Sequence, residues 1–280
     1  MCTDGRPNPT CRAGTCPAKR LNAGSREIGA ALPALGTVVS CTANDAALLS
    51  HTGEYATPAH PGEALICGQE QINVRLGVDV TGYLTPQALT LTDTVGTHRA
   101  YLTPMSDPLA VKGLSLAPRG PQVPFTAEDW MDVDWNDTDQ IDHLDSLSDE
   151  RYRVLPFTGA RKIDPRVLPH LLVYLVEQHV EYTVAVPGGG CVQLHRGRAA
   201  MADMSGPAVA VIFGAARYAL DPVQVGECWV STLHGAAGPT AAIEIYDRSR
   251  RCITVLTLTG SVCGHTYDAW QAIATSLPGL

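Results

Sequence analysis

The chain contains two blocks of short strand-like segments that resemble each other, and this internal repeat limits the possible folds more than any other feature. Residues 32–53 (LPALGTVVSCTANDAALLSHTG) align with residues 175–197 (LVEQHVEYTVAVPGGGCVQLHRG), so that His51 and His195 both fall two residues before a glycine. Residues 72–84 align with 209–221, and residues 87–103 align with 241–257. Because each block reads as a helix, antiparallel strands and a closing hairpin, the sequence predicts a duplicated α+β unit.

The strand pattern rests on short β-branched segments separated by glycine or proline. In the first block these are ALGTVVSCT, EALICGQ, INVRLGV and QALTLTD; in the second they are YTVAVP, CVQLHRG, PAVAVIFG, GECWVSTL, TAAIEIYD and CITVLTLTG. Residues 165–179 (PRVLPHLLVYLVEQH) have the apolar spacing of an amphipathic helix, and YDAWQAIATSL near the end predicts another. We therefore expect a Cys/Pro-rich tail over 1–18, a first repeat over 19–103, a Pro/Gly-rich and acidic linker with a helix over 104–160, and a second repeat over 161–280.

Composition and charge exclude several classes of protein. Of the 280 residues, 45% are hydrophobic and 17% are charged, which is typical of a globular chain. The sequence has no apolar run long enough to span a bilayer and no apolar region near its start that would suggest a secretory signal, so we expect a cytoplasmic protein with no membrane partner. The net charge is −8, and ten acidic residues without a Lys or Arg lie between Glu128 and Glu150. No basic stripe is present, which argues against nucleic-acid binding, and the acidic run is typical of a solvated helix or linker face.

Three of the nine cysteines lie in the Pro/Gly-rich start of the chain. Cys2, Cys11 and Cys16 have the spacing C-x8-C-x4-C, which lacks the C-x2-C pair of common zinc sites. These residues are either incidental thiols of an exposed tail or ligands of a metal or cluster. The sequence does not assign them a role.

The segment PGGGCVQLHRG, residues 187–197, has the glycines of a phosphate-binding loop but not its other features. The lysine of a P-loop is absent, and a strand follows where a helix would be needed. A tight turn between two strands explains the glycines. The resulting hairpin places Cys191, Gln193 and His195 on one face of its second strand.

Several of these segments together resemble the hemin-degrading (HemS-like) family. The segments GGCVQLHRG, WVSTL, TAAIEIYDRSRRCITVL and YDAWQAIATSLP are similar to the second repeat of that family, and KRLNAG, LPALGTVVSCTAND and LICGQEQINVRL are similar to the first. The resemblance covers roughly residues 19–280 and identifies the chain as a divergent member. It implies two similar halves, each a large antiparallel sheet with flanking helices, and a cytoplasmic protein of heme utilisation that carries heme or degrades it. The implied partners are heme itself and an electron-donating reductase or a downstream heme oxygenase.

The resemblance also implies which residues contact heme. Arg75 in INVRLG matches the family arginine that lies over the heme, and an arginine in an apolar strand needs an anionic partner or a buried salt bridge. The family's axial histidine has no clean match, because WNDTDQIDHLDSLSDERYRVL is about five residues shorter than the family segment. His143 is the only histidine in that stretch and is the candidate iron ligand, with a solvated helix histidine as the alternative. His51 and His195 are further candidates, although His195 matches a strand position that is more often structural.

Two differences from the family pattern support an alternative function. Leu49 stands where the family has a histidine, and the basic pair that follows Trp-Val is replaced by STLHG. The alternative is a non-enzymatic protein of the same fold that has lost the usual axial ligand and binds another ligand or a partner protein.

Overall fold

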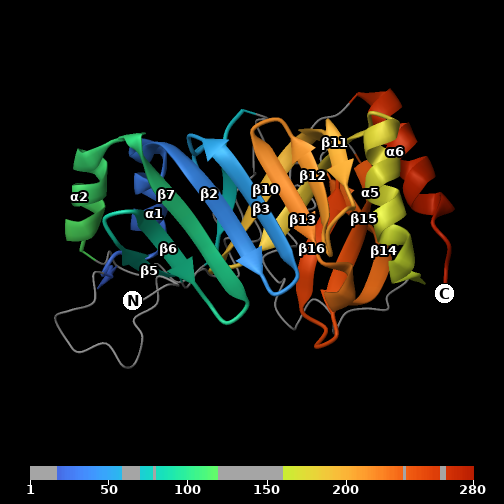
Figure 1. The fold of residues 1–280 in the computed structure, drawn as a ribbon, viewed down its shortest axis with the longest axis horizontal. Coiled ribbons are helices and arrows are strands. Elements are labelled where there is room, and N and C mark those ends of the chain that lie inside the picture. Colours follow the sequence, from blue (N-terminus) through green and yellow to red (C-terminus); the bar gives the residue numbers. More distant parts are fainter. Residues whose placement is uncertain (1–17, 59–69, 78–79, 119–159, 236–237, 259–262) are drawn as a thin grey trace.

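The structure is a computed structural model, and it describes residues 18–58, 70–77, 80–118, 160–235, 238–258 and 263–280. Two large antiparallel sheets with a few helices form the molecule, which confirms the expected α+β class (Figure 1). The expected strand EALICGQ and the acidic run Glu128–Glu150 lie outside the described residues.

The larger sheet has nine strands. Their order across the sheet is β1 (Lys19–Arg20), β5 (Thr81–Leu84), β6 (Ala88–Thr92), β7 (Gly96–Ser106), β2 (Gly36–Asn44), β3 (Ala47–Gly53), β13 (Ala216–Leu220), β12 (Val209–Phe213) and β11 (Met201–Asp203).

The smaller sheet has seven strands. Their order is β4 (Asn73–Leu76), β10 (Cys191–Arg198), β9 (Glu181–Pro187), β16 (Cys252–Thr257), β15 (Gly238–Asp247), β14 (Val225–Gly235) and β8 (Arg161–Ile163).

The two sequence blocks exchange strands, so that each sheet contains strands from both. After β3, the next described strand of the first block, β4, pairs with β10 in the seven-stranded sheet. After β10, the strands β11 to β13 of the second block join the nine-stranded sheet, where β13 pairs with β3. Since each block completes the other's sheet, the halves are interlocked. The residue ranges expected for the two repeats stay a prediction.

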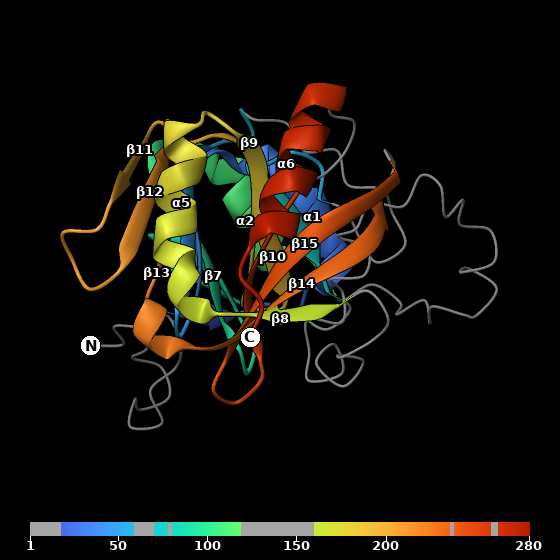
Figure 2. The same ribbon diagram turned by 90° about the vertical axis from the view of Figure 1, so that its right-hand side faces the viewer.

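The helices lie at two ends of the molecule. α1 (Ser25–Ala31) and α2 (Pro108–Leu116) are at one end, and α5 (Leu168–Glu177) and α6 (Gly264–Ser276) are at the other (Figures 1 and 2). Short 3-10 turns cover Pro33–Leu35, Pro165–Val167 and Pro222–Gln224. α2 begins inside the segment expected to be a linker, because Asp107 accepts hydrogen bonds from the amides of Leu109 and Ala110 and Pro108 occupies the first helical position.

The segment PGGG forms the predicted hairpin turn between β9 and β10. Gly189 and Gly190 have φ values of 74°, and the amide of Gly188 donates to the carbonyl of Cys191 at 2.9 Å. A Cβ on Gly189 would lie 2.4 Å from the amide nitrogen of His98 on β7. The hairpin tip therefore packs against the nine-stranded sheet, which only glycine permits at this distance.

Two core clusters fill the space beside and between the sheets. One includes the buried faces of α5 and α6 together with Tyr182 on β9 and Phe213 on β12; the other surrounds α1 and includes Ile28 and Leu89. Trp270 of α6 is fully buried, stacks on Tyr182 at a centroid distance of 6.3 Å, and donates from Nε1 to the carbonyl of Ala241. The terminal helix is thus fixed to the seven-stranded sheet by its tryptophan.

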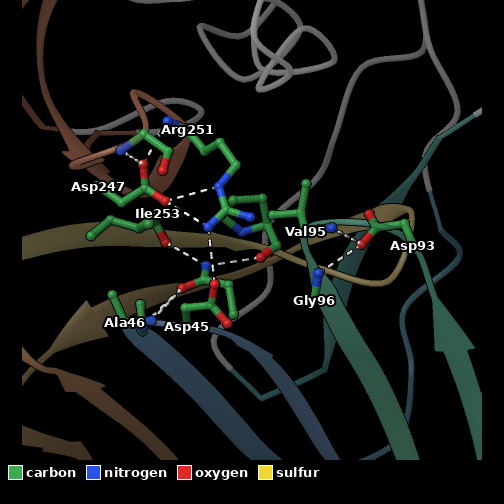
Figure 3. A network of polar contacts seen from close by, with 12 residues as sticks. Asp45, Ala46, Asp93, Val95, Gly96, Asp247, Arg251 and Ile253 are labelled. Carbon is green, nitrogen blue, oxygen red and sulfur yellow. Dashed lines mark hydrogen bonds and ion pairs between the residues drawn. The ribbon is translucent and has the colours of Figure 1, made fainter. Parts of the chain in front are cut away.

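Polar contacts connect the sheets where β2 turns into β3. The side-chain amide of Asn44 donates to the carbonyls of Pro187 and Ile253 at 3.0 and 2.9 Å, both in the seven-stranded sheet. Figure 3 shows Arg251 close by, paired with Asp45 at 2.9 Å and with Asp247 at 2.8 Å. These contacts hold the β2–β3 turn against β9 and β16.

Candidate functional site

Arg75 lies at the middle of β4 and is 1% exposed. Its direct partner across the ladder is Val192 of β10, and residues directly opposite in an antiparallel pair share a face of the sheet. By alternation, Arg75 and Asn73 point to one face, while Val74 and Leu76 point to the other.

The face of β10 opposite to Arg75 is turned toward the nine-stranded sheet. Gln193 accepts hydrogen bonds there from the hydroxyls of Ser40 and Thr42 on β2, at 2.8 and 2.7 Å. His195 contacts His51 of β3 on the same side. The prediction that Cys191, Gln193 and His195 share one face is confirmed, and that face lies between the two sheets.

We use the name Arg75 face for the other side of the seven-stranded sheet. Because directly paired residues share a face, the pairing of the strands shows which residues of β4, β10, β9, β16, β15 and β14 belong to it. Arg196 of β10 and Glu227 of β14 lie on this face and are partly exposed. Its buried residues include Asn73, Arg75, Thr183, Ala185, Val192, Leu194, Trp229, Ser231, Glu244, Tyr246, Val255 and Thr257. Asn73 beside Arg75 on β4 is polar. The group formed by Val192, Ala185 and Val255 across the next three strands is apolar, and β15 and β14 carry a further polar part.

The centre of that polar part is Glu244 on β15, which is 0% exposed. Its two carboxylate oxygens accept hydrogen bonds from the hydroxyl of Ser231 on β14 and from the hydroxyl of Tyr246, each at 2.5 Å. Buried carboxylates require such partners, and hydrogen bonds to a charged acceptor are short and strong. No motif in the sequence marks these residues, although the alternation in TAAIEIYD places Glu244 and Tyr246 on one face.

His51 and His195 lie between the sheets and point away from the Arg75 face. Their rings meet at a centroid distance of 5.1 Å and an interplanar angle of 89°, and Phe213 lies 4.9 Å from His195. Burial lowers the pKa of His195 to about 4, and the neighbouring His51 adds to this effect. Burial also lowers the pKa of His51, partly offset by the charge of Glu70. Both rings are therefore neutral near pH 7 and belong to the packing between the sheets.

A third histidine of this region belongs to a buried polar network. His98 on β7 exchanges hydrogen bonds with the hydroxyl of Thr42 at 2.6 Å and with the hydroxyl of Tyr55 at 2.8 Å. Burial lowers the pKa of His98 to about 4 and raises the pKa of Tyr55. The sequence offered little signal for this network, because its members come from separate strands.

The remaining predicted candidates are only partly covered by the structure. His143, Cys2, Cys11 and Cys16 lie outside the described residues. The described cysteines Cys41, Cys191, Cys228, Cys252 and Cys263 are free thiols. Within the described ranges, no group of three or more His, Cys, Asp or Glu side chains is placed to hold a metal ion.

No helix in the described part of the chain has both the length and the apolar character needed to cross a membrane.

Comparison with known proteins supports the fold. No model of a known protein family matches the chain, and no curated protein sequence matches it significantly. Among solved structures, the heme degrading enzyme ChuS from Escherichia coli O157:H7 aligns with a TM-score of 0.70 and 18% identity, over 95% of this chain and 88% of that one. Apo-PhuS, a heme-binding protein from Pseudomonas aeruginosa, aligns with a TM-score of 0.68 and 19% identity, over 94% of this chain and 87% of that one. The chain therefore has the fold of ChuS and PhuS along nearly its whole length.

Proposed function

We propose that this chain is a heme-binding protein of heme utilisation and that heme binds on the Arg75 face. The single observation that carries the proposal is a fully buried arginine on a strand of the sheet that the fold shares with heme-binding proteins. A guanidinium at such a position suits the carboxylate of a heme propionate, because its planar fork can form two charge-assisted hydrogen bonds with it.

The side chains beside Arg75 fit the rest of the ligand. Val192 lies directly opposite on β10, and Leu194, Ala185 and Val255 continue the same face across three strands. These buried aliphatic groups form an apolar floor of the kind that a porphyrin requires. Bound heme would supply an iron that reacts with O2, and the protein would hold the propionate and exclude water.

The cellular location, the choice between carrying and degrading heme, and the partners rest on the sequence resemblance to the hemin-degrading family. We propose that the protein works in the cytoplasm and either carries heme or degrades it. An electron-donating reductase would be its partner in degradation, and a downstream heme oxygenase in transfer. His143 stays a candidate iron ligand on the same grounds.

One observation favours the alternative function. Among the strand histidines whose side chains the structure describes, His51, His98 and His195 lie between the sheets and do not reach the Arg75 face. A chain with the same scaffold and no axial histidine would bind a different apolar anion or a partner protein in this place.

A hemin titration separates the two functions. We expect the purified protein to shift the Soret band of hemin and to saturate near one equivalent. Arg75→Ala should weaken binding by about 10- to 100-fold, which corresponds to the loss of charge-assisted hydrogen bonds. Arg75→Lys should restore part of the affinity, and Arg217→Ala, which removes an exposed arginine of β13, should change nothing.

The outcomes are distinct. A wild-type protein without a saturable shift would contradict heme binding and leave the alternative function. Saturable binding that Arg75→Ala does not weaken would contradict the placement of heme on the Arg75 face. If hemin binds, ascorbate or a reductase with O2 separates a carrier, which keeps its Soret band, from an enzyme, which loses it.

A further inference from the structure

We propose that two copies of this chain form a dimer through α2, each helix packing antiparallel on the exposed apolar side of the other. We use the name α2 stripe for that side, which consists of Leu109, Gly113 and Leu116. The proposal goes beyond the proposed heme binding and does not depend on it.

α2 is apolar on two opposite sides. On one side Leu114 is 3% exposed and, with the partly buried Val111, belongs to the core cluster around α1. On the other side Leu109 and Leu116 are 77% and 69% exposed. The spacing i, i+4, i+7 places the α2 stripe in one line along the helix, and α2 forms one end of the molecule (Figure 1). An exposed apolar line on a helix that already buries its other side in the core is typical of an interaction surface.

Gly113 at the middle of the stripe indicates that the element packed there is a helix. A Cβ at Gly113 would meet nothing within 4 Å, and its φ value is not positive, so the single chain does not require glycine at this position. Glycine also weakens a helix relative to alanine. The distance between two packed helices depends on the side chains at their contact, so a glycine at the crossing point allows close approach.

The stripe is complementary to itself in an antiparallel arrangement. A two-fold axis beside Gly113 places Leu109 of each copy against Leu116 of the other. Every contact then occurs twice, as in other interfaces between identical patches. A second copy of the chain is therefore an occupant whose shape and chemistry match the stripe.

The charges at the two ends of α2 favour the same arrangement. Nζ of the exposed Lys19 donates to the carbonyl of Ser115 at 2.8 Å, which places a positive charge at the C-terminal end of the helix. The exposed carboxylate of Asp107 caps the N-terminal end. Antiparallel packing brings Lys19 of each copy toward Asp107 of the other and pairs opposite ends of the helix dipoles.

The size of the stripe predicts a reversible dimer. α2 has nine residues, and Met105 just before it is 74% exposed and widens the apolar surface. A contact between two such helices lies at the lower end of specific interfaces, at about 1,000 Å² in total. We expect a dissociation constant on the order of 10 μM.

Sedimentation velocity of the full chain over a concentration series measures this equilibrium. Leu109→Glu and Leu116→Lys should each weaken the dimer at least about 10-fold. An equimolar mixture of the two variants should recover a dimer, because the introduced carboxylate of one faces the introduced ammonium group of the other. Val223→Glu is the matched control, since Val223 is 63% exposed on the turn Pro222–Gln224, and it should leave the dimer unchanged.

Variants of Gly113 separate association from folding. Gly113→Leu should raise the Tm of the monomer, because leucine favours a helix and the position is open, yet it should weaken the dimer at least about 10-fold. A lowered Tm together with an unchanged dimer would contradict the role of Gly113 at the crossing point.

The other outcomes are equally decisive. A wild type that stays monomeric at about 200 μM would overturn the proposal. If Leu109→Glu then lowers the Tm of that monomer, another part of the same chain covers the stripe. A dimer that persists in Leu109→Glu would place the interface elsewhere, and a mixture of the two folded charge variants that stays monomeric would overturn the antiparallel arrangement.

Discussion

His51 and His195 occupy the same position in the two repeated sequence blocks, and their rings meet edge to face across the two sheets at a centroid distance of 5.1 Å. The contact follows from the exchange of strands, because β13 pairs with β3 in the larger sheet and β4 pairs with β10 in the smaller one. The equivalent strands β3 and β10 thereby face each other at the centre of the molecule. Two imidazoles in this position must both be neutral in the folded protein.

This relationship predicts a loss of stability in mild acid. Burial lowers the pKa of His195 to about 4, whereas the ring has its usual pKa of about 6.5 in the unfolded chain. The unfolded state therefore binds more protons, and the contribution of His195 is complete above pH 6.5 and is lost as the pH falls toward 4. The lost free energy of unfolding amounts to about 3 kcal/mol by the end of that interval.

Urea unfolding between pH 7.5 and 4.5 measures this effect. In His195→Phe the free energy of unfolding should depend less on pH in the upper part of this pH range. The phenyl ring can keep the contact with Phe213, and it does not titrate. His170→Ala on α5 serves as the control, since its side chain is exposed. Equal acid sensitivity of wild type and His195→Phe would show that His195 does not limit stability in acid.

Alanine variants at Gly189 and Gly214 distinguish the cost of backbone strain from the cost of steric crowding. Both have positive φ values, 74° and 77°, so an alanine at either position strains the backbone by about 1 kcal/mol. A Cβ at Gly189 would also lie 2.4 Å from the amide nitrogen of His98 and 2.6 Å from the carbonyl oxygen of Leu91, whereas nothing lies within 4 Å at Gly214. We expect Gly189→Ala to lower the free energy of unfolding by about 3 kcal/mol or more, and Gly214→Ala by only about 1 kcal/mol. Similar denaturant midpoints for the two variants would contradict the packing of the hairpin tip.

Asn44 should contribute more to stability than its place at a strand end suggests. Its amide group donates to Pro187 and Ile253, and its oxygen accepts from the amides of Ala46 and Ala47 at 3.1 and 2.8 Å. Asn44→Ala leaves two carbonyls of the other sheet without this donor, and we expect a loss of about 2 kcal/mol. Thermal unfolding measures it, with the exposed Asn22→Ala as the control. A change no larger than that of Asn22→Ala would show that the sheets do not depend on this connection.

Local patterns in the sequence were sufficient for most elements. The alternation in CVQLHRG correctly placed Cys191, Gln193 and His195 on one face, because side-chain direction in a strand depends only on the backbone. The apolar spacing of residues 165–179 likewise predicted α5. Residues 104–160 are predicted to form a linker with a helix, and α2 begins in the first part of this stretch, where Asp107 caps it.

The arrangement of the candidate site depended on the tertiary structure. The sequence by itself determined most of the strands and the hairpin at PGGG, which depend on short-range periodicity and turn chemistry, and its resemblance to a known family made Arg75 a candidate. The sequence did not determine that β4 pairs with a strand of the other block. It therefore could not show that Arg75 lies on one side of the seven-stranded sheet and that His51 and His195 lie on the other side. Strand pairing between distant segments decided this separation, because a strand's partners determine which layer each of its two faces meets. The same pairing placed Glu244 and Tyr246 on the Arg75 face and joined residues more than 150 positions apart in one candidate site.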